Sequence, residues 1–506
     1  MRASRPHRSA TVTLLTLLIN LAGFVVTSNA AESRSSLVIV VDGLRPDYIT
    51  TEIMPNLHAF GEAGAIGEAH HSVFPTVTRV NSSSISTGTY PRAHGLMHNT
   101  IYLPDASPDP IDTGDAAALL AARTATGQLL TARTIGELLA QNGKKVLVVG
   151  SGTTGSALLL NPTLPNGAVL LNSRNFVRPS AMQARAEAVL GSAPESAYPN
   201  RAGNRWAIDA YLEIGLKEIH PDLTLMWITD PDGTAHRYGP GAPKTVEALR
   251  HVDEELGRLF ATLKERGLRD RTNIFITADH GFSMHGGPFN LNALLTARGL
   301  ADGVKVVGGT QIYVRTGGDE KIRRIVRVLQ ETEWVGALFT RASSPGSDEG
   351  FAGGTLSFDS IHYQHPRAAD ILVDPNWSHA VNQHGFAGAT TSGGVAGHGS
   401  SSPYDIRIRL IAAGPDLKKA VRSSVPTGNI DLAVTLCHLH GLKPAPTMAG
   451  RVMHELLRTG TTIEAVRVER TVHRVTTATV SGRYELELHK SRVGTTEYIE
   501  YTQTKR

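Results

Sequence analysis

Cysteine is almost absent from this chain of 506 residues, which contains only Cys437. One cysteine excludes an intramolecular disulfide, and a chain with 41% apolar residues can form a sufficient core without one. Cys437 falls in an apolar helical pattern that includes Ile430, Leu436 and Leu439. We therefore expect it to be a buried packing residue.

A long membrane-spanning run is also missing. The most apolar segment, residues 11–26, has roughly 16 residues, whereas a spanning helix needs about 20. Arg2, Arg5 and Arg8 precede this segment and small residues follow it at 28–30, which is the pattern of a cleaved export signal. We predict a signal peptide at 1–30, a periplasmic or secreted mature protein and no stable membrane anchor. An uncleaved anchor is the alternative.

Excess charge of one sign is absent beyond this segment. The formal net charge of +4 includes three arginines and no acid within residues 1–30, so the rest of the chain carries about +1. No basic stripe remains that would favour a nucleic-acid polymer. We expect a small molecule as the binding partner, and no pattern indicates an oligomeric state.

Short apolar runs rich in branched residues predict buried parallel strands. They are residues 36–41, 145–150, 223–229, 273–277 and 369–373. Amphipathic helical patterns alternate with them, at 206–219 and most clearly at 246–266. This alternation predicts an α/β fold of the doubly wound type, with a mostly parallel sheet.

The chain divides into three predicted parts after the export signal. We expect a catalytic domain at 31–460, a cap inserted in it at about 285–360, and a β-rich C-terminal extension at 461–506 where apolar and polar residues alternate. Residues 100–130 and 170–205 are expected to be loop-rich and to line the mouth of a pocket.

Acidic residues directly follow three of the predicted strands. Asp42 follows 36–41, Asp232 follows 223–229, and the pair Asp279 and His280 follows 273–277. In doubly wound folds the ligand-binding residues lie at the carboxyl ends of the strands. We therefore expect these side chains to gather at one edge of the sheet.

Two further histidines extend this set. His236 lies four residues after Asp232 in a Pro/Gly-rich loop, and His398 lies between two glycines. Each feature alone is more typical of a surface turn, but together they supply three carboxylates and three imidazoles. Such oxygen and nitrogen donors hold divalent ions that activate a poor nucleophile, so the pattern favours a two-metal hydrolase.

Thr78 is the candidate nucleophile. It follows Pro75 and stands at or near the start of a helix-like segment that ends near Gly88. The free N–H groups and the positive dipole end of a helix start favour an anion there. A helix-capping role for Thr78 is the simpler alternative, and Thr76 and Ser82 compete for the same catalytic function.

The order of these motifs resembles the alkaline phosphatase superfamily, and within it the type I phosphodiesterase/nucleotide pyrophosphatase family. The matching motifs are Val-Asp-Gly-Leu-Arg at 41–45, Phe-Pro-Thr-x-Thr-x-x-Asn at 74–81, Thr-Gly-x-Tyr-Pro at 87–91, His-Gly-x-x-x-Asn at 94–99, Asp-Pro-Asp-x-x-x-His at 230–236, Asp-His-Gly at 279–281 and Gly-His-Gly at 397–399. The resemblance extends from about residue 37 to about residue 442.

The resemblance implies a site with two zinc ions or other divalent metals. One ion would be held by Asp232, His236 and His398, and the other by Asp42, Asp279 and His280. Thr78 would lie between the ions as ligand and nucleophile, and the Asn99 amide would stabilise the phosphate. The implied activity is hydrolysis of phosphodiester or pyrophosphate bonds in nucleotide-type substrates through a phospho-threonine intermediate.

The chain departs from the family pattern beside the nucleophile. Arg79 stands where many members have an aromatic residue, and it contacts a substrate oxygen or points to solvent. Ser82 stands where many members have histidine. Tyr90 and Tyr102 are candidates for base stacking, although Tyr90 lies in a Tyr-Pro turn that suggests a structural role.

Other functions remain open on the same fold. A phosphonate hydrolase or a phosphomonoesterase would gain from an additional cation near the phosphoryl group, which Arg79 or Arg45 could supply. A non-catalytic zinc-binding envelope protein is the non-enzyme alternative. A sulfatase is disfavoured because Cys437 lies far from every site motif.

Overall fold

The structure, a computed structural model, describes residues 1–2, 4, 34–480 and 482–506. The predicted signal peptide at 1–30 therefore lies outside the described residues except for three of its positions. The chain divides into two units, residues 1–33 and 34–506, and the description below concerns the second. In the described part of the chain, no helix combines the length and the apolar character needed to cross a bilayer.

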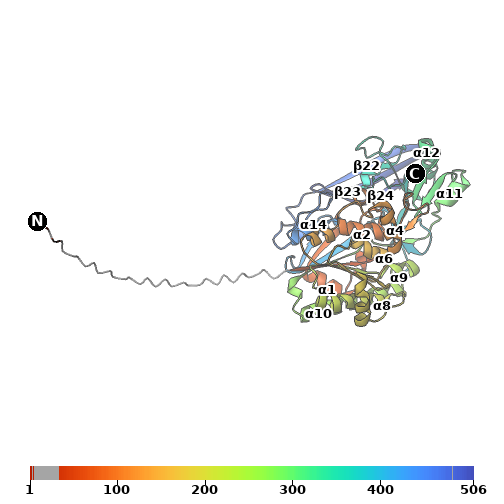
Figure 1. Cartoon of the computed structure of the whole chain (residues 1–506). Helices are drawn as coiled ribbons and strands as arrows, with labels where there is room; N and C mark the ends of the chain where they lie inside the picture. Colours follow the sequence, from red (N-terminus) through yellow and green to blue (C-terminus); the bar gives the residue numbers. More distant parts are fainter. Residues whose placement is uncertain (3, 5–33, 481) are drawn as a thin grey trace. The chain divides into compact units, whose positions relative to one another are not determined.

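A ten-stranded sheet forms the centre of the second unit (Figure 1), in the order β20-β2-β19-β9-β1-β8-β5-β6-β7, with β21 paired to β2. Its parallel block consists of β9 (Thr272–Thr277), β1 (Ser35–Val41), β8 (Leu223–Ile228), β5 (Val146–Gly150) and β6 (Val169–Asn172). The flanking strands are β19 (Arg407–Ala413), β2 (Ala65–His71), β20 (Val421–Ser423), β21 (Thr427–Gly428) and β7 (Phe176–Arg178). The mostly parallel sheet predicted from the sequence is confirmed.

Strand β1 shows why this sheet needs helices on both faces. Leu37, Ile39 and Val41 pack in one core, whereas Val38 and Val40 pack in another, because successive side chains of a strand point to opposite faces. The first core is covered by α1 (Pro55–Ala63), α8 (Arg201–Asp209) and α10 (Pro243–Glu265), and the second by α2 (Thr78–Thr87), α6 (Thr154–Leu160), α5 (Ile135–Gln141) and α14 (Asn429–Leu439). Cys437 is buried in the second core, as expected.

A second sheet has five strands and follows the main parallel block in sequence. Its order is β11 (Val304–Val307), β12 (Gln311–Val314), β15 (Ile371–Pro375), β13 (Val335–Thr340) and β14 (Leu356–Ser357), with helices α11 (Leu291–Ala297) and α12 (Gly318–Gln330). The prediction of residues 369–373 as a parallel strand is wrong, because β15 pairs antiparallel with β12 and β13. A strand buried on both faces has the same apolar pattern in either kind of sheet.

The C-terminal residues form the predicted antiparallel strands β22 (Val468–Thr479), β23 (Gly482–Val493) and β24 (Thr496–Lys505). Tyr484, Leu486 and Leu488 of β23 belong to the same apolar core as the five-stranded sheet. The Tyr484 hydroxyl donates a hydrogen bond to the Gly336 carbonyl at 2.9 Å. The last strands are thus anchored on the second sheet.

The two regions expected to be loop-rich contain regular elements. Residues 100–130 include β3 (Thr100–Ile101), β4 (Ile111–Asp112) and α4 (Ala116–Thr126), whose Leu119 and Ala122 pack against α6. Residues 170–205 include α7 (Gln183–Leu190) and the start of α8. The helix expected at 206–219 begins as α8 and continues as the π-helical segment η3 (Ala210–Ile219).

Short elements complete the carboxyl-end edge of the main sheet. A four-stranded sheet has the order β16 (Trp377–Val381), β17 (Ala387–Thr390), β10 (Ser283–His285) and β18 (Ala396–Gly397). The short helices are α3 (Pro91–His94), α9 (Asp232–Tyr238) and α13 (Pro403–Ile406). Strands β10 and β18 pair with each other, which brings the chain after β18 back to the end of β9.

Candidate active site

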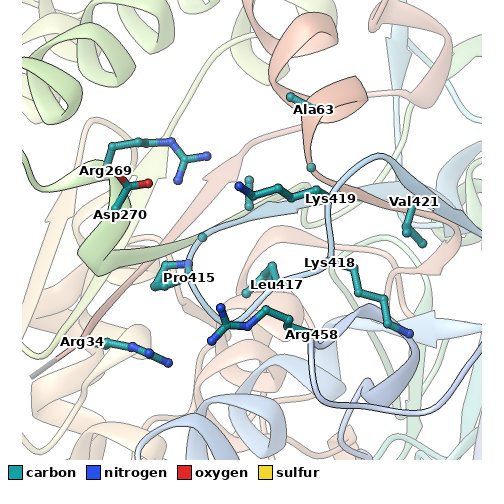
Figure 2. A pocket seen from close by; sticks show the side chains of 13 residues that line it. Arg34, Ala63, Arg269, Asp270, Pro415, Leu417, Lys418, Lys419, Val421 and Arg458 are labelled. Carbon is teal, nitrogen blue, oxygen red and sulfur yellow. The ribbon is translucent and has the colours of Figure 1, made fainter. Parts of the chain in front are cut away.

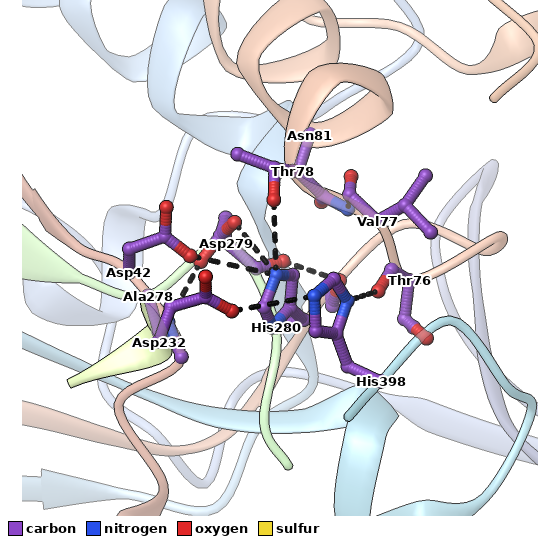
Figure 3. A network of polar contacts seen from close by, with 12 residues as sticks. Asp42, Thr76, Val77, Thr78, Asn81, Asp232, Ala278, Asp279, His280 and His398 are labelled. Carbon is purple, nitrogen blue, oxygen red and sulfur yellow. Dashed lines mark hydrogen bonds and ion pairs between the residues drawn. The ribbon is translucent and has the colours of Figure 1, made fainter. Parts of the chain in front are cut away.

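The fold brings the predicted site residues to one edge of the main sheet (Figure 3). Asp42 follows β1, Asp279 and His280 follow β9, and Asp232 opens α9 after β8. His236 lies one turn further along α9, and His398 follows β18. Residues far apart in the chain therefore meet at the carboxyl ends of parallel strands, as doubly wound topology requires.

Two groups of potential metal ligands occur in this cluster. In the first, the Nε2 atoms of His236 and His398 lie 3.2 and 3.3 Å from Asp232 Oδ1. In the second, His280 Nε2 lies 2.9 Å from Asp279 Oδ2 and 3.5 Å from Asp42 Oδ1. Ligand atoms of Asp42, Asp232 and His280 also lie within 4.8 Å of one another, so Asp232 reaches both groups.

The orientation of the three imidazoles is fixed by backbone carbonyls. His236 Nδ1 lies 2.9 Å from the Ala396 oxygen, His280 Nδ1 lies 2.9 Å from the Gly281 oxygen, and His398 Nδ1 lies 2.8 Å from the Thr76 oxygen. A carbonyl accepts only from a protonated nitrogen, so Nδ1 carries the hydrogen in all three rings. Nε2 of each ring therefore faces the carboxylates, which is the arrangement of metal-binding histidines.

The carboxylates present matching lone pairs. Asp42 Oδ1, Asp232 Oδ1 and Asp279 Oδ2 are buried and accept no hydrogen bond from the described residues. A bare imidazole nitrogen and a bare carboxylate oxygen repel each other at about 3 Å unless a proton or a cation lies between them. The donor set therefore fits divalent cations, and carboxylate with imidazole is a set that zinc accepts.

Electrostatics in the cluster support the same reading. Burial, together with the neighbouring Asp279 and Asp232, raises the pKa of Asp42 well above its usual range, and burial raises the pKa of Asp279 to about 7. Burial lowers the pKa of His236, but the Asp232 carboxylate outweighs burial and raises this pKa to about 9. A proton on His236 therefore supplies the positive charge beside Asp232 when no metal is bound. Burial and His280, whose ring stacks 3.3 Å away, lower the pKa of His398 to about 4.

Thr78 is the first residue of α2, and its hydroxyl points toward the cluster (Figure 3). Its Oγ1 lies 3.4 Å from His280 Nε2, and the capping position belongs to Val77, which has no capping side chain. The competing hydroxyls serve other purposes: Thr76 Oγ1 donates to the Ser400 carbonyl at 2.7 Å and Ser82 Oγ to the Thr78 carbonyl at 3.0 Å. Of the three candidates, only Thr78 has a hydroxyl directed at the ligand cluster.

Asn99 lies beside the start of α2. Its Oδ1 accepts a hydrogen bond from the Arg79 backbone N–H at 3.0 Å. This bond fixes the amide so that the Nδ2 hydrogens are the donors left for an incoming oxygen. The orientation agrees with the phosphate-stabilising role that the motif implies.

Several supporting residues escaped sequence reasoning. Trp227 of β8 donates from Nε1 to Asp42 Oδ2 at 2.9 Å, and the Gly43 N–H donates to Asp279 Oδ1 at 3.1 Å. These bonds occupy the far oxygens and leave the other oxygen of each carboxylate toward the imidazoles. The strand alternation that places Trp227 beside Asp42 depends on the pairing of β1 with β8, which the sequence alone does not reveal.

Comparison with known proteins places this chain in a family. The sequence model of the type I phosphodiesterase / nucleotide pyrophosphatase family matches residues 36–399, which is most of the chain. The chain belongs to this family.

Relatives and a solved structure of the family are similar to this chain. Venom phosphodiesterase 2 of Crotalus adamanteus is 26% identical over 252 residues, which cover 49% of this chain and 27% of the venom protein. Ectonucleotide pyrophosphatase/phosphodiesterase family member 7 of Homo sapiens is 28% identical over 444 residues, covering 86% and 85% of the two chains. Murine ectonucleotide pyrophosphatase/phosphodiesterase 5 has the same fold, with a TM-score of 0.60, 18% identity, and 84% of this chain and 100% of its own covered. This chain thus spans about a quarter of the length of the venom phosphodiesterases.

Two cavities border the cluster of potential metal ligands. One, of about 310 Å³, is lined by Thr78, Arg79, Arg174, Tyr198 and Asp232 among others. The other, of about 470 Å³, is lined by Asn99, His398, Phe289 and Leu291 among others. Residues 170–205 contribute to the first cavity, as expected. Residues 100–130 line neither cavity, so the expectation is wrong for residues 100–130.

A larger cavity, of about 890 Å³, lies away from the cluster (Figure 2). It is lined by Arg34, Arg269 and Gly414, which lie at or near the amino ends of β1 and β9 and the end of the antiparallel strand β19. The ligand cluster lies at the opposite ends of β1 and β9. The size of a cavity therefore does not locate the site in this protein.

Three residues considered from the sequence serve elsewhere. Tyr90 stacks on His362 and its hydroxyl donates to the Glu497 carbonyl, and Tyr102 packs against Tyr313. Arg45 is buried, pairs with Asp47 at 2.6 Å and donates to the Phe282 carbonyl at 2.6 Å. None of the three lines either cavity at the cluster.

Proposed function

We propose that this chain hydrolyses phosphodiester or pyrophosphate bonds in small nucleotide-type phosphate esters, through a phosphorylated Thr78. The observation that carries the proposal is the position of the Thr78 hydroxyl, whose Oγ1 lies 3.4 Å from His280 Nε2. The same cluster contains three buried carboxylate oxygens, from Asp42, Asp232 and Asp279, that accept no hydrogen bond from the described residues. The names of relatives, including Bis(5'-adenosyl)-triphosphatase ENPP4 of Bos taurus, 24% identical over 86% of this chain, support the same bond class.

The ligand sets are proposed as two triads. Asp232, His236 and His398 would hold one divalent ion, and Asp42, Asp279 and His280 would hold the other. Bound zinc would lower the pKa of the Thr78 hydroxyl and neutralise charge that develops on the phosphoryl oxygens. Imidazole with carboxylate favours zinc over magnesium or calcium, which prefer oxygen ligands alone.

The residues of the chain then perform two displacements. Thr78 Oγ1 attacks phosphorus, which forms the Oγ1–P bond and breaks the bond to the leaving alcohol or phosphate. Asn99 Nδ2 and the open first turn of α2 donate to the phosphoryl oxygens. Water then attacks the same phosphorus and breaks the Oγ1–P bond, which releases the second product and restores the hydroxyl.

The alternatives on this fold have weaker support. Arg45 is committed to Asp47, so of the two arginines considered for a phosphomonoesterase only Arg79 remains near the nucleophile. A non-catalytic zinc protein would not need the Thr78 hydroxyl, whose one side-chain contact among the described residues is with His280 of the ligand cluster. We also propose that the protein works outside the cytoplasm, after removal of residues 1–30.

Replacing Thr78 by alanine tests the proposal most directly. We expect turnover of bis(4-nitrophenyl) phosphate to fall by at least about a thousandfold, because the nucleophile is removed, while the bound zinc measured by mass spectrometry stays within error of the wild type. Thr76→Val and Ser82→Ala are matched controls that should keep most activity. Unchanged turnover in Thr78→Ala would refute the phospho-threonine route, and a large preference for 4-nitrophenyl phosphate would refute the diesterase assignment.

A further inference from the structure

The two cavities beside the ligand cluster differ in charge. The cavity that contains Thr78 is lined by two arginines, Arg79 and Arg174. The cavity on the side of Asn99 is lined by no lysine or arginine, and Phe289 and Leu291 contribute apolar surface to it. The surroundings of a bound phosphoryl group are therefore asymmetric.

Arg79 is held next to the nucleophile without an acidic partner. Its Nε is buried and has no hydrogen-bond partner among the described residues. The guanidinium lies against Gly114, where a Cβ atom would come within 2.4 Å of Nη2. The neighbouring Asp112 accepts from the Gly114 N–H at 2.8 Å and forms no ion pair with Arg79. A buried donor without a partner is costly unless a ligand satisfies it.

Arg174 approaches the same cavity from the loop after β6. Its side chain is exposed and makes no hydrogen bond or ion pair with the residues that the structure describes. The Arg174 N–H donates to Asn172 Oδ1 at 2.8 Å, which ties the backbone at Arg174 to the end of β6. Two guanidinium groups from different elements thus face one space.

The acids of this cavity do not neutralise the arginines. Asp230 accepts from the Asn200 N–H, Asn204 Nδ2 and Thr234 Oγ1 at 2.7 to 2.8 Å, so its charge is already compensated. Asp42 and Asp232 direct their free oxygens toward the imidazoles. The arginines remain available for a negative group on the ligand.

Building on the proposed function, we propose that Arg79 and Arg174 form a subsite for a second anionic group of the substrate. The substrate class is an asymmetric phosphate ester: one substituent carries a phosphate or carboxylate, and the other is a neutral organic group that lies against Phe289 and Leu291. Guanidinium groups suit this recognition because they form paired, charge-assisted hydrogen bonds with planar or tetrahedral oxyanions. An aromatic residue at position 79 would instead offer a stacking surface.

The test compares two esters with the same leaving group. We would measure kcat/KM for 4-nitrophenyl phenyl phosphate and for the same ester with a carboxylate on its phenyl ring. The wild type should prefer the carboxylated ester. Arg79→Ala and Arg174→Ala should each lose about tenfold or more on the carboxylated ester, while activity on the plain ester changes less than about threefold.

Two further variants separate charge from folding defects. Gly114→Ala keeps both arginines but displaces the Arg79 guanidinium, so it should weaken the preference as well. Arg185→Ala removes an exposed arginine that pairs with Glu218 far from the cavity, and it should leave the preference unchanged. Raising the salt concentration should reduce the wild-type preference, because the charges are partly exposed.

The outcomes distinguish this subsite from the proposed function. Equal losses on both esters in the Arg79 and Arg174 variants, or no wild-type preference, would overturn the subsite while the Thr78→Ala result still decides the reaction. If Thr78→Ala keeps full turnover of both esters, the proposed function fails instead. A preference that disappears in both arginine variants and remains in Arg185→Ala supports the subsite.

Discussion

Aspartates at the site and away from it differ in how their buried oxygens are used. Away from the site, Asp431 accepts from the Gly428 and Arg451 N–H groups, both at 2.8 Å, and from the Tyr498 hydroxyl at 2.7 Å. At the site, Asp232 Oδ1 accepts no hydrogen bond and faces two imidazole nitrogens. A structural acid is surrounded by donors, whereas a ligand acid keeps lone pairs that only a cation can satisfy.

Asp230 and Asp232, which both follow β8, show this difference between a structural acid and a ligand acid most clearly. Asp232→Asn should reduce turnover by at least about a thousandfold and lower the bound zinc, because a ligand shared by both groups is lost. Asp230→Asn should keep its zinc and lose about 1–3 kcal/mol of unfolding free energy, because donors lose their charged acceptor. Metal analysis and urea unfolding of both variants check this, and equal zinc loss in both would remove the distinction.

Metal removal tests the same contrast without mutation. A chelator should abolish turnover and lower the free energy of unfolding, because bare carboxylates and imidazoles then lack a cation. Free zinc at about 100 times its dissociation constant should raise the free energy of unfolding of the metal-free protein by about 2.7 kcal/mol. Differential scanning calorimetry with and without zinc measures the shift. A melting temperature that does not respond to zinc, in protein shown to be metal-free beforehand, would contradict the metal site.

Asp42 combines the two ways of using carboxylate oxygens. Its Oδ2 accepts a hydrogen bond from Trp227 Nε1, as in a structural acid, and its Oδ1 is left for a metal. Trp227→Phe should weaken zinc affinity by about tenfold to a hundredfold, as is typical when a group that orients a ligand is lost. Zinc titration with a competing chelator measures the affinity. An affinity equal to the wild type would show that Asp42 does not need this donor to keep its orientation.

Asp374 provides the smallest effect and lies outside the ligand cluster. Burial raises its pKa to about 8, although the Ser401 side chain and N–H donate to it. A carboxyl group with a raised folded pKa stabilises the fold below its unfolded pKa, near 4, and loses this contribution as the pH rises toward 8. Asp374→Asn should therefore reduce the loss of unfolding free energy between pH 5 and pH 8 in zinc-loaded protein by at least about 1 kcal/mol, and by at most about 4 kcal/mol, the limit that these two pKa values set. Identical pH slopes for both proteins would contradict the assignment.

Sequence patterns predicted the elements that create the site better than the elements around it. Strands β1, β8 and β9 are consecutive branched, apolar residues followed by acids, so both their burial and the edge where they end could be inferred. The strand pairing that places Trp227 beside Asp42, and the approach of Arg174 to Arg79, depend on contacts between distant segments. The antiparallel pairing of β15 was missed because a strand buried on both faces has the same local pattern in either kind of sheet. Helix α4 was missed although its local signals are present: it is rich in alanine, Asp115 caps its start and Gly127 follows its end.

The ligand cluster has a consequence for the order of events in the life of the chain. Asp42 comes near the beginning of the family segment at 36–399 and His398 near its end. The proposed triad of Asp42, Asp279 and His280 needs β1 and β9 of the central sheet to be paired, and the triad of Asp232, His236 and His398 also needs the short strand β18, which lies more than a hundred residues further along the chain. If the two triads hold the ions as proposed, the Asp42 triad could bind its metal before the Asp232 triad is complete, so filling of the second site would report that β18 has docked beside the central sheet.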